Sequence, residues 1–467
     1  MKRNVLWVGI LVLAIMLAMG SVALAEGVQP KAAKQTVITL SDAGDDVLIN
    51  NSGNYIIKGT TTSQHIVVTC SAQITLDNVT MNLTDGSTPF KVLGGNGKAT
   101  LKLSGLNVLV SSAAGAPALE VKDGASLTIQ NLSSKKPGKL YAYHRPSTNS
   151  NASSGVIGGQ SSGEIHIQSG EIRALVQESR PIYSSHAGIG GGTRANGYQI
   201  RISGGTVTAQ GGEDGAGIGS GNTGSAEVTI SGGTVNATGG YYGAGIGSGM
   251  SANATVTISG GNVTAKGGYN GAGIGSGYSG SATVTISGGT VTATGGSFGA
   301  GIGSGRDYSS ADVTISGGKV TARGGAWGAG IGSGSYDSDA IVTITGGRVT
   351  AAGGAWGAGI GSGSYDSDAI VTITGGRVTA AGGAWGAGIG SGSYDSDAIV
   401  TIKGGSVTAR GGAWGAGIGS GSYASDATVT IKGGSVTATG STFGAGIGSG
   451  GYGSNAEVTI SGGRVTA

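Results

Sequence analysis

Nine copies of the heptapeptide GAGIGSG constrain the fold of this chain more than any other feature. They begin at Gly215, Gly243, Gly271, Gly299, Gly328, Gly357, Gly386, Gly415 and Gly444, so that successive copies lie 28 or 29 residues apart. Residues 325–353 and 354–382 are identical letter for letter, which indicates a recent tandem duplication. A fixed period of roughly 20 to 50 residues is typical of proteins that stack one structural unit on the next.

Each repeat contains short segments in which apolar and polar residues alternate, separated by glycine pairs. Val342, Thr343 and Ile344 form one, the RVTA segment at 348–351 forms the second, and AWGAGIGSG at 326–334 forms the third. Alternation with a period of two indicates strands, and the glycines between them indicate turns. None of these segments can bury a core alone. We therefore predict an all-β fold, a right-handed parallel β-solenoid (β-helix) with about 28–29 residues per coil.

The composition excludes the other folds that a glycine-rich chain can adopt. Glycine supplies 101 of 467 residues, but there are six prolines and no G-X-Y period, which excludes collagen. Valine and isoleucine recur at fixed positions, which argues against disorder. A net charge of +3 without a basic cluster gives no case for nucleic acid as a partner. Cys70 is the single cysteine, so no disulfide can form within the chain.

Alternation through GAGIGSG places Ile331 in the core and Gly328, Gly330, Gly332 and Gly334 together on the opposite side. We therefore expect the glycines to give an almost bare outer face. The aromatic residues of this segment share the parity of Ile331. They are Trp327, Trp356, Trp385 and Trp414. We expect them to stack inward or at a corner along the axis, with a role in sugar binding as the alternative.

The amino-terminal residues predict export. Lys2 and Arg3 precede a long apolar run that ends at Ala23-Leu24-Ala25, the pattern of a cleaved secretory signal peptide. An uncleaved membrane anchor is the alternative. The expected parts are a signal peptide at 1–25, a short linker at 26–35, irregular solenoid coils at 36–142, a polar loop at 143–163 and regular repeats at 164–467. For 36–142, a separate β-sandwich remains open. We expect a secreted protein with no membrane insertion after cleavage.

The order of these segments resembles a known family. The stretch GNYIIKGTTTSQHIVVTCSAQITLDNVTM, then GASLTI, then tandem GAGIGSG…VTISGGTVTATGG is similar to secreted bacterial carbohydrate-binding β-helix proteins of Gram-positive cell surfaces. The resemblance implies polysaccharide binding with bound calcium. It transfers no ligand motif residue by residue. The chain ends within a repeat at GGRVTA and shows no cell-wall sorting signal, which leaves the mode of anchoring open.

A tyrosine column is the first candidate site. Tyr336, Tyr365, Tyr394, Tyr423 and Tyr452 follow the glycine segment in successive repeats. If the strand continues, they fall on the glycine face and form an exposed column. Parallel strands lie about 4.8 Å apart, which is close to the repeat of a pyranose chain. The column is therefore a candidate surface for sugars to stack on, and shielding of the glycine backbone is the alternative.

The same loops carry six aspartates. They are Asp337, Asp339, Asp366, Asp368, Asp395 and Asp397. Carboxylates stacked at the spacing of the coils repel one another unless they are screened, paired or bound to metal. Oxygen ligands suit calcium, which makes calcium the candidate cofactor. Arg348 and Arg377 are candidate charge partners, and a solvated charged edge is the alternative.

Other functions are weighed on the remaining outward residues. Threonine columns such as Thr343, Thr372 and Thr401 suggest ice binding, but charged residues such as Arg348 and Lys319 interrupt the flat array. Catalysis is not expected, because His65, His144, His166 and His186 are scattered without triad spacing. We therefore predict a non-catalytic protein that binds extracellular or cell-wall polysaccharide, with a passive adhesin stalk as the alternative; an ice-binding protein and a polysaccharide-degrading β-helix enzyme are further alternatives.

Overall fold

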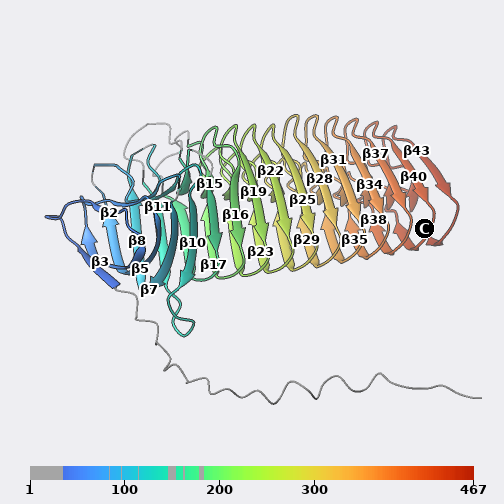
Figure 1. The fold of residues 1–467 in the computed structure, drawn as a ribbon. Helices are drawn as coiled ribbons and strands as arrows, with labels where there is room; N and C mark the ends of the chain where they lie inside the picture. The colour runs from blue at the N-terminus through green and yellow to red at the C-terminus, as the bar shows by residue number, and fades with distance from the viewer. Residues whose placement is uncertain are drawn as a thin grey trace, which may run out of the picture.

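The computed structural model describes residues 35–83, 85–95, 97–113, 115–145, 154–160, 163–177 and 184–467. These residues form one long rod in which every coil lies against the next (Figure 1). The predicted signal peptide at 1–25 lies outside the described residues. Within the described ranges all regular secondary structure is β-strand, and no helix is long and apolar enough to cross a membrane.

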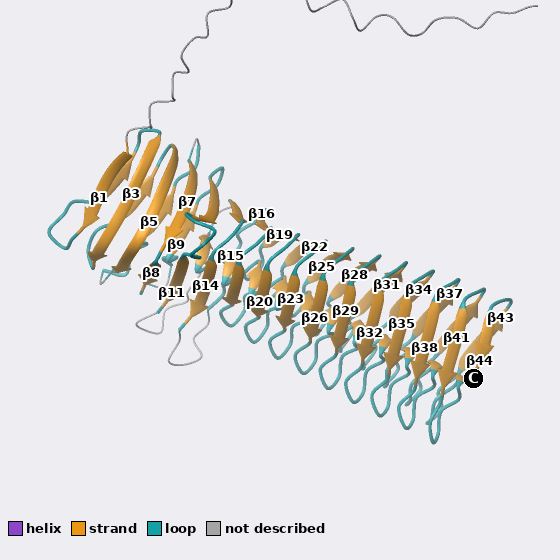
Figure 2. Ribbon diagram, turned by 90° about the horizontal axis from the view of Figure 1, so that it is seen from below, coloured by secondary structure: helices purple, strands orange, loops and turns teal. Residues whose placement is uncertain are grey.

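Two parallel sheets run the length of the rod, one of 29 strands and one of 15. In the amino-terminal coils the larger sheet contains β1 (Gln35–Leu40), β3 (Gly53–Thr61), β5 (Ser71–Asn82), β7 (Lys98–Ser104), β8 (Leu106–Ser111), β10 (Ser126–Asn131), β11 (Lys139–His144), β13 (Glu164–Ile167) and β14 (Glu171–Val176). In the regular coils it divides into two faces, which Figure 2 shows from below. A turn that contains a glycine pair, such as Gly346-Gly347, joins them.

The strands of the first face begin each regular coil. They are β16 (Tyr198–Ile202), β19 (Ser225–Ile230), β22 (Asn253–Ile258), β25 (Ser281–Ile286), β28 (Ser310–Ile315), β31 (Asp339–Ile344), β34 (Ala369–Ile373), β37 (Ala398–Ile402), β40 (Ala427–Ile431) and β43 (Ala456–Ile460). Those of the second face follow the turn. They are β17 (Thr206–Gln210), β20 (Thr234–Thr238), β23 (Asn262–Lys266), β26 (Thr290–Thr294), β29 (Lys319–Arg323), β32 (Arg348–Ala352), β35 (Arg377–Ala381), β38 (Ser406–Arg410), β41 (Ser435–Thr439) and β44 (Arg464–Thr466).

The smaller sheet is the third face, and its strands are the shortest. They are β2 (Val47–Ile49), β4 (Ile66–Val68), β6 (Phe90–Val92), β9 (Leu119–Val121), β12 (Ile157–Gly159), β15 (Ile189–Gly191), β18 (Ile218–Gly219), β21 (Ile246–Gly247), β24 (Ile274–Gly275), β27 (Ile302–Gly303), β30 (Ile331–Gly332), β33 (Ile360–Gly361), β36 (Ile389–Gly390), β39 (Ile418–Gly419) and β42 (Ile447–Gly448). The predicted polar loop at 143–163 thus contains β12, and part of that loop lies outside the described residues.

The register of the paired strands confirms the predicted stacking of each coil on the next. Ala340 pairs with Ala369, and Ile344 pairs with Ile373, so each residue lies beside its equivalent 29 positions later. Side chains alternate along each strand, and the inward set is Val342 and Ile344 on the first face, with Val349 on the second; all three are fully buried. Burial of an aliphatic side chain contributes about 1.5–3 kcal/mol. The parallel β-solenoid and its repeat length are therefore as the sequence predicts.

The glycines do not form a bare outer face, and that prediction was wrong. Gly328, Gly330, Gly332 and Gly334 are buried. A Cβ on Gly332 would lie 1.9 Å from the carbonyl oxygen of Gly361, and Gly332 has a φ of +136°. Glycine is present here because the backbone of the next coil occupies the space that a side chain would need.

Serines inside the turns satisfy the backbone of this narrow core. Ser333 is fully buried, and its Oγ accepts a hydrogen bond of 2.9 Å from the Gly363 N–H of the next coil. Ser338 is also fully buried and donates to the Ser335 carbonyl at 3.1 Å. The same serine hydrogen bonds recur in successive coils. One repeated residue type therefore satisfies the buried polar groups of the backbone in each coil.

The amino-terminal coils join the same two sheets but use longer strands and larger side chains. Strand β5 has 12 residues, and Phe90, Leu101 and Met81 are fully buried. The side-chain amide of Asn107 links adjacent irregular coils. Its Oδ1 accepts a hydrogen bond from the Val79 N–H at 2.9 Å, and its Nδ2 donates to the Lys139 carbonyl at 3.1 Å. Here specific side chains, rather than a repeated motif, fix each coil.

Candidate functional site

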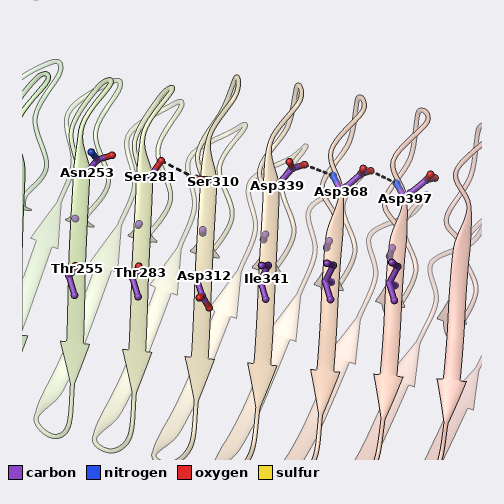
Figure 3. A pocket seen from close by; sticks show the side chains of 18 of the residues that line it. Asn253, Thr255, Ser281, Thr283, Ser310, Asp312, Asp339, Ile341, Asp368 and Asp397 are labelled. Carbon is purple, nitrogen blue, oxygen red and sulfur yellow. Dashed lines mark hydrogen bonds between the residues drawn. The ribbon is translucent and has the colours of Figure 1, made fainter.

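A groove of about 1260 Å³ runs along the first face, parallel to the axis of the rod (Figure 3). Its floor is a column of small alanines, one from each coil, and side chains that precede and follow each alanine form its two walls. The first wall is Ser225, Asn253, Ser281, Ser310, Asp339, Asp368, Asp397, Asp426 and Asn455, and the second includes Thr255, Thr283, Asp312, Ile341, Ile370, Ile399 and Thr428.

The alternation of the first-face strands creates this groove. Asp339 and Ile341 both point outward from β31, and Ala340 between them points inward and is 3% exposed. In-register pairing repeats this arrangement, since Ala311 pairs with Ala340 and Ala340 with Ala369. The two outward columns therefore stay parallel over many coils, and the space between them suits an extended ligand that follows the axis.

The aspartate ladder is the part of the first wall formed by Asp339, Asp368, Asp397 and Asp426. Oδ1 of Asp368 accepts a hydrogen bond of 2.9 Å from the Asp397 N–H, and Oδ1 of Asp397 accepts one of 2.9 Å from the Asp426 N–H. Asp339 accepts from the Asp368 N–H at 3.3 Å. These backbone donors hold like charges in a row that would otherwise repel, and they orient the carboxylates along the wall.

Burial and the closeness of the carboxylates to one another still shift the pKa of some of these aspartates. Burial raises the pKa of Asp368, and the neighbouring Asp397 and Asp339 carboxylates raise it further, against the lowering effect of the Asp397 N–H. Asp366 lies at the tip of the loop, and its pKa is raised by partial burial and by Asp337 and Asp395. Each column is therefore a line of negative charge that a cation or a hydroxyl donor would relieve.

The opposite wall carries an isoleucine strip that the sequence interpretation missed. Ile341, Ile370 and Ile399 are 49%, 45% and 51% exposed, although they occupy outward positions where other coils have threonine. The signal was present in the sequence: DAIVTI replaces the polar residue of SATVTI by isoleucine in three successive repeats. An exposed apolar strip beside a carboxylate ladder is a feature of binding surfaces.

The five predicted tyrosines lie outside the groove, in the loop that precedes the first face. The strand does not continue to them, because β30 ends at Gly332 and both Tyr336 and Asp337 have positive φ, at 64° and 50°. The parity argument for an exposed column on a glycine face was therefore wrong. Tyr336, Tyr365, Tyr394 and Tyr423 are half-buried, and Tyr452 is 51% exposed.

The tyrosines instead stack on one another. Tyr336, Tyr365 and Tyr394 have successive centroid distances of 4.6 and 4.7 Å with interplanar angles of 8° and 2°. Tyr423 and Tyr452 continue the column at 4.8 and 4.7 Å. Each inner ring has its two faces covered by its neighbours, so a sugar that approaches this tyrosine column meets ring edges and hydroxyl groups rather than open ring faces.

A tryptophan column lies beside the tyrosines, as predicted for a corner stack. Trp327 and Trp356 have centroids 5.1 Å apart at 6°, and Trp356 and Trp385 lie at 5.0 Å and 6°. Trp327 also contacts Tyr365 at 5.4 Å. The two columns pack as one aromatic seam along the loops, and such contacts add to stability.

The loop aspartates are the predicted candidate ligands for calcium. In the described part of the chain, no group of three or more His, Cys, Asp or Glu side chains lies close enough to hold a metal ion. Arg348 and Arg377 are not their partners, because Asp339 begins β31 whereas Arg348 begins β32 after the turn, at the far end of the first face. Among the described residues no ion pair joins these groups.

Two of the four histidines meet, although the sequence showed them as scattered. His144 Nδ1 and His186 Nε2 are 3.3 Å apart, and both side chains are buried. The His144 Nε2–H donates to the Ala113 carbonyl at 2.9 Å, which leaves Nδ1 of a neutral His144 as an acceptor that faces His186 Nε2, and His186 Nδ1 lies 3.3 Å from the Ala187 carbonyl. Burial lowers the pKa of His186 to about 3 and lowers the pKa of His144. They lie 42 residues apart in irregular coils, where no period links them.

The comparison with protein families agrees with this geometry. Nine segments match the model of the beta helix repeat, at residues 200–222, 228–250, 256–278, 284–306, 313–335, 342–364, 371–393, 400–422 and 429–451. Each match covers the end of one first-face strand, the following second-face strand and the glycine segment. No curated protein and no solved structure matches the chain. The protein is a parallel β-helix repeat protein.

Proposed function

We propose that this protein is an exported, non-catalytic β-helix protein that binds extracellular or cell-wall polysaccharide in the groove of the first face. The observation that carries the proposal is the groove itself, with the aspartate ladder on one wall and the isoleucine strip on the other. It is linear, parallel to the axis and repeated at the spacing of the coils. A polymer with one unit per coil would meet the same contacts in every unit.

The chemistry of the two walls fits a sugar chain. Carboxylates accept hydrogen bonds from hydroxyl groups, and the hydrogen bonds between neighbouring members of the ladder use Oδ1, which leaves Oδ2 for a ligand. The isoleucines offer apolar surface to the C–H faces of a sugar ring. Binding sites of this type combine apolar contact with a few placed polar groups. The tyrosine hydroxyls contribute at the loop edge.

Export and the absence of catalysis belong to this proposal. The amino-terminal residues have the pattern of a signal peptide, and the outer polysaccharides of a cell are the polymers that an exported protein meets. The four carboxylates of the aspartate ladder share one environment, whereas an acid-base pair needs two groups with different environments.

Affinity electrophoresis of the full chain in gels that contain cellulose derivatives, xylan, mannan or pectin tests the proposal. We expect at least one polymer to retard the protein, and Ile341→Asp with Ile370→Asp to abolish the retardation. Thr350→Asp with Thr379→Asp, which adds the same two carboxylates on the exposed second face, is the control for charge and should be retarded like the wild type. Free migration through every gel would contradict the proposal.

A passive adhesin stalk is the second candidate, and the identical repeats favour it, because gain or loss of a repeat changes the length of a rod without disturbing it. Variants with one or two fewer copies of the 29-residue repeat distinguish the two. Binding in the groove predicts that retardation weakens with each coil removed, whereas a stalk shows no retardation at any length.

A further inference from the structure

Charges in the regular coils are segregated by sign. Residues 300–467 are all described, and they contain ten acidic and nine basic side chains. Arg306 and Asp307 form the one ion pair among them, with a distance of 3.4 Å. The other eight cations therefore have no carboxylate partner within the chain, although an almost equal number of carboxylates lies on the same rod.

The acidic groups gather along one edge. Asp337, Asp366 and Asp395 lie at the tips of the loops, and the aspartate ladder follows directly at the start of the first face. We call this the acidic edge. All of its members are exposed: Asp337, Asp339, Asp366, Asp368, Asp395, Asp397 and Asp426.

The basic groups lie beyond the turn that ends the first face. Lys403 and Lys432 are in that turn, and Lys319, Arg348 and Arg377 begin successive strands of the second face. We call these and the remaining exposed cations of that face the basic face: Lys319, Arg323, Arg348, Arg377, Lys403, Arg410, Lys432 and Arg464. The strands of the second face contain no acidic residue between 319 and 466.

Each surface carries an electrostatic cost that the single chain leaves in place. Lys319 pairs with Arg348, and Arg348 pairs with Arg377, so three cations lie directly beside one another on adjacent strands. Like charges opposite one another in a sheet are destabilising. At the acidic edge, partial burial and then the neighbouring carboxylates raise the pKa of Asp366 and Asp368. A partner that brings the opposite charge at the same spacing would remove both costs.

We propose that this partner is a second copy of the chain, which places its acidic edge against the basic face of the first. The two ladders have the same repeat because both come from the same coils, so two rods that lie parallel bring opposite charges together along several coils. The contact joins two different surfaces and is therefore heterologous. A docked pair keeps one free acidic edge and one free basic face, so further copies can add and the rods assemble side by side into an open array.

Sedimentation velocity of the full chain tests the inference. At about 0.01 M salt, where screening is weak, we expect the mass to rise with protein concentration, and at about 1 M salt, where the Debye length is about 3 Å, we expect monomer. Arg348→Glu with Arg377→Glu should weaken association at least tenfold, as should Asp337→Lys with Asp366→Lys. Lys135→Glu with Lys136→Glu makes the same change in net charge as the Arg348→Glu, Arg377→Glu variant, but on an exposed loop of the amino-terminal coils. This control should associate like the wild type.

Mixing the two face variants gives the sharpest test. Each has one altered and one intact surface, so neither variant should associate alone, whereas an equal mixture should form a one-to-one complex through the two intact surfaces. A wild type that stays monomeric at low salt would overturn the inference, and so would an Arg348→Glu, Arg377→Glu variant that associates normally. Retention of the wild type, but not of this variant, on an anionic polysaccharide without self-association would also overturn it and assign the basic face to such a polymer. These variants leave the isoleucine strip intact, so loss of polysaccharide binding in the groove is scored separately.

Discussion

The amino-terminal coils and the regular coils build the same architecture by opposite means. In the first, the core contains large and varied side chains such as Phe90, Leu101 and Met81, and individual contacts such as the Asn107 amide fix each irregular step. In the second, the same positions repeat as alanine, valine, isoleucine, serine and glycine, and neighbouring backbones approach so closely that a side chain would not fit. One region is held by complementary shapes, and the other by repetition.

This difference shows where each region is vulnerable. In the varied core of the amino-terminal coils, the stability lost on substitution depends on the side-chain volume that the substitution removes. A repeated backbone contact allows no added atom, but a change in one coil affects only that coil and the coils that it contacts directly.

Glycine substitution should separate the two regions most clearly. Gly361 in the regular coils has a φ of +137°, and its Cβ would lie 1.9 Å from the Gly390 carbonyl oxygen, whereas Gly95 in the amino-terminal coils has a φ of +81° with nothing within 4 Å. Gly361→Ala should lower the free energy of unfolding by about 4 kcal/mol or more, and Gly95→Ala by about 1 kcal/mol. Denaturant unfolding measures both, and equal losses would show that the backbone conformation alone matters.

Acid should weaken the junction around the histidine pair. The pKa of His186 is lowered from an ordinary value near 6.5 to about 3 by burial, so the folded state binds fewer protons than the unfolded state between these values. Stability is therefore intact above pH 6.5 and falls by about 1.4 kcal/mol per pH unit below it, or about 3 kcal/mol at pH 4. Urea unfolding at pH 7 and pH 4 measures this loss.

A variant isolates the histidine contribution. His186→Gln removes the titrating group while keeping a hydrogen-bond donor for His144, so its stability should change less between pH 7 and pH 4 than that of the wild type. A wild type and a variant with the same acid dependence would show that other groups dominate.

The aromatic seam should contribute a moderate amount. Tyr365 stacks on Tyr336 and Tyr394, and its pKa is raised by partial burial and by these two neighbours. Tyr365→Ala should cost about 1–2 kcal/mol, because the stacked pairs lose their central ring. Tyr365→Phe keeps the ring and should cost less than about 0.5 kcal/mol. Thermal unfolding compares them, and a phenylalanine variant as unstable as the alanine variant would assign the effect to the hydroxyl group.

Removal of a loop charge should give the smallest effect, with the opposite sign. The pKa of Asp366 is raised, so its charged form is less favourable in the folded state, and stability falls as the pH rises from about 3.8 through the folded pKa. Because the side chain is exposed to screening, Asp366→Asn should gain only a few tenths of a kcal/mol at pH 7, and the gain should vanish near pH 3. A loss of stability at pH 7 that chelator abolishes would instead indicate a bound cation such as calcium.

Periodicity was sufficient to predict the core but not the loops. Val342, Ile344 and Val349 follow from alternation in segments that are true strands, and the structure buries all three. The same rule failed at Tyr336, because it requires an extended backbone and the chain takes positive φ at Gly332 and again at Tyr336. Sequence alternation carries no information about side-chain direction once the strand has ended.

The candidate site was only half visible in the sequence. Asp339, Asp368 and Asp397 were identified as a charged column, and they line the groove. The isoleucine strip on the opposite wall was overlooked, because an isoleucine in a β-rich repeat is assigned to the core unless its register is followed. The His144–His186 contact had no signal at all, since it joins irregular coils of unequal length.

The identical sequence of residues 325–353 and 354–382 has a consequence for folding. A shift of one whole coil, 29 residues, exchanges Ala340 for Ala369 and Ile344 for Ile373, so nearly all contacts between the shifted coils are unchanged. Internal contacts in this part of the chain therefore cannot select one alignment over its neighbour, and misaligned intermediates are close in energy to the native state. The unique side chains of the amino-terminal coils remove this degeneracy, because they have no equivalent one coil away. The amino-terminal coils therefore fix which coil pairs with which along the rest of the rod.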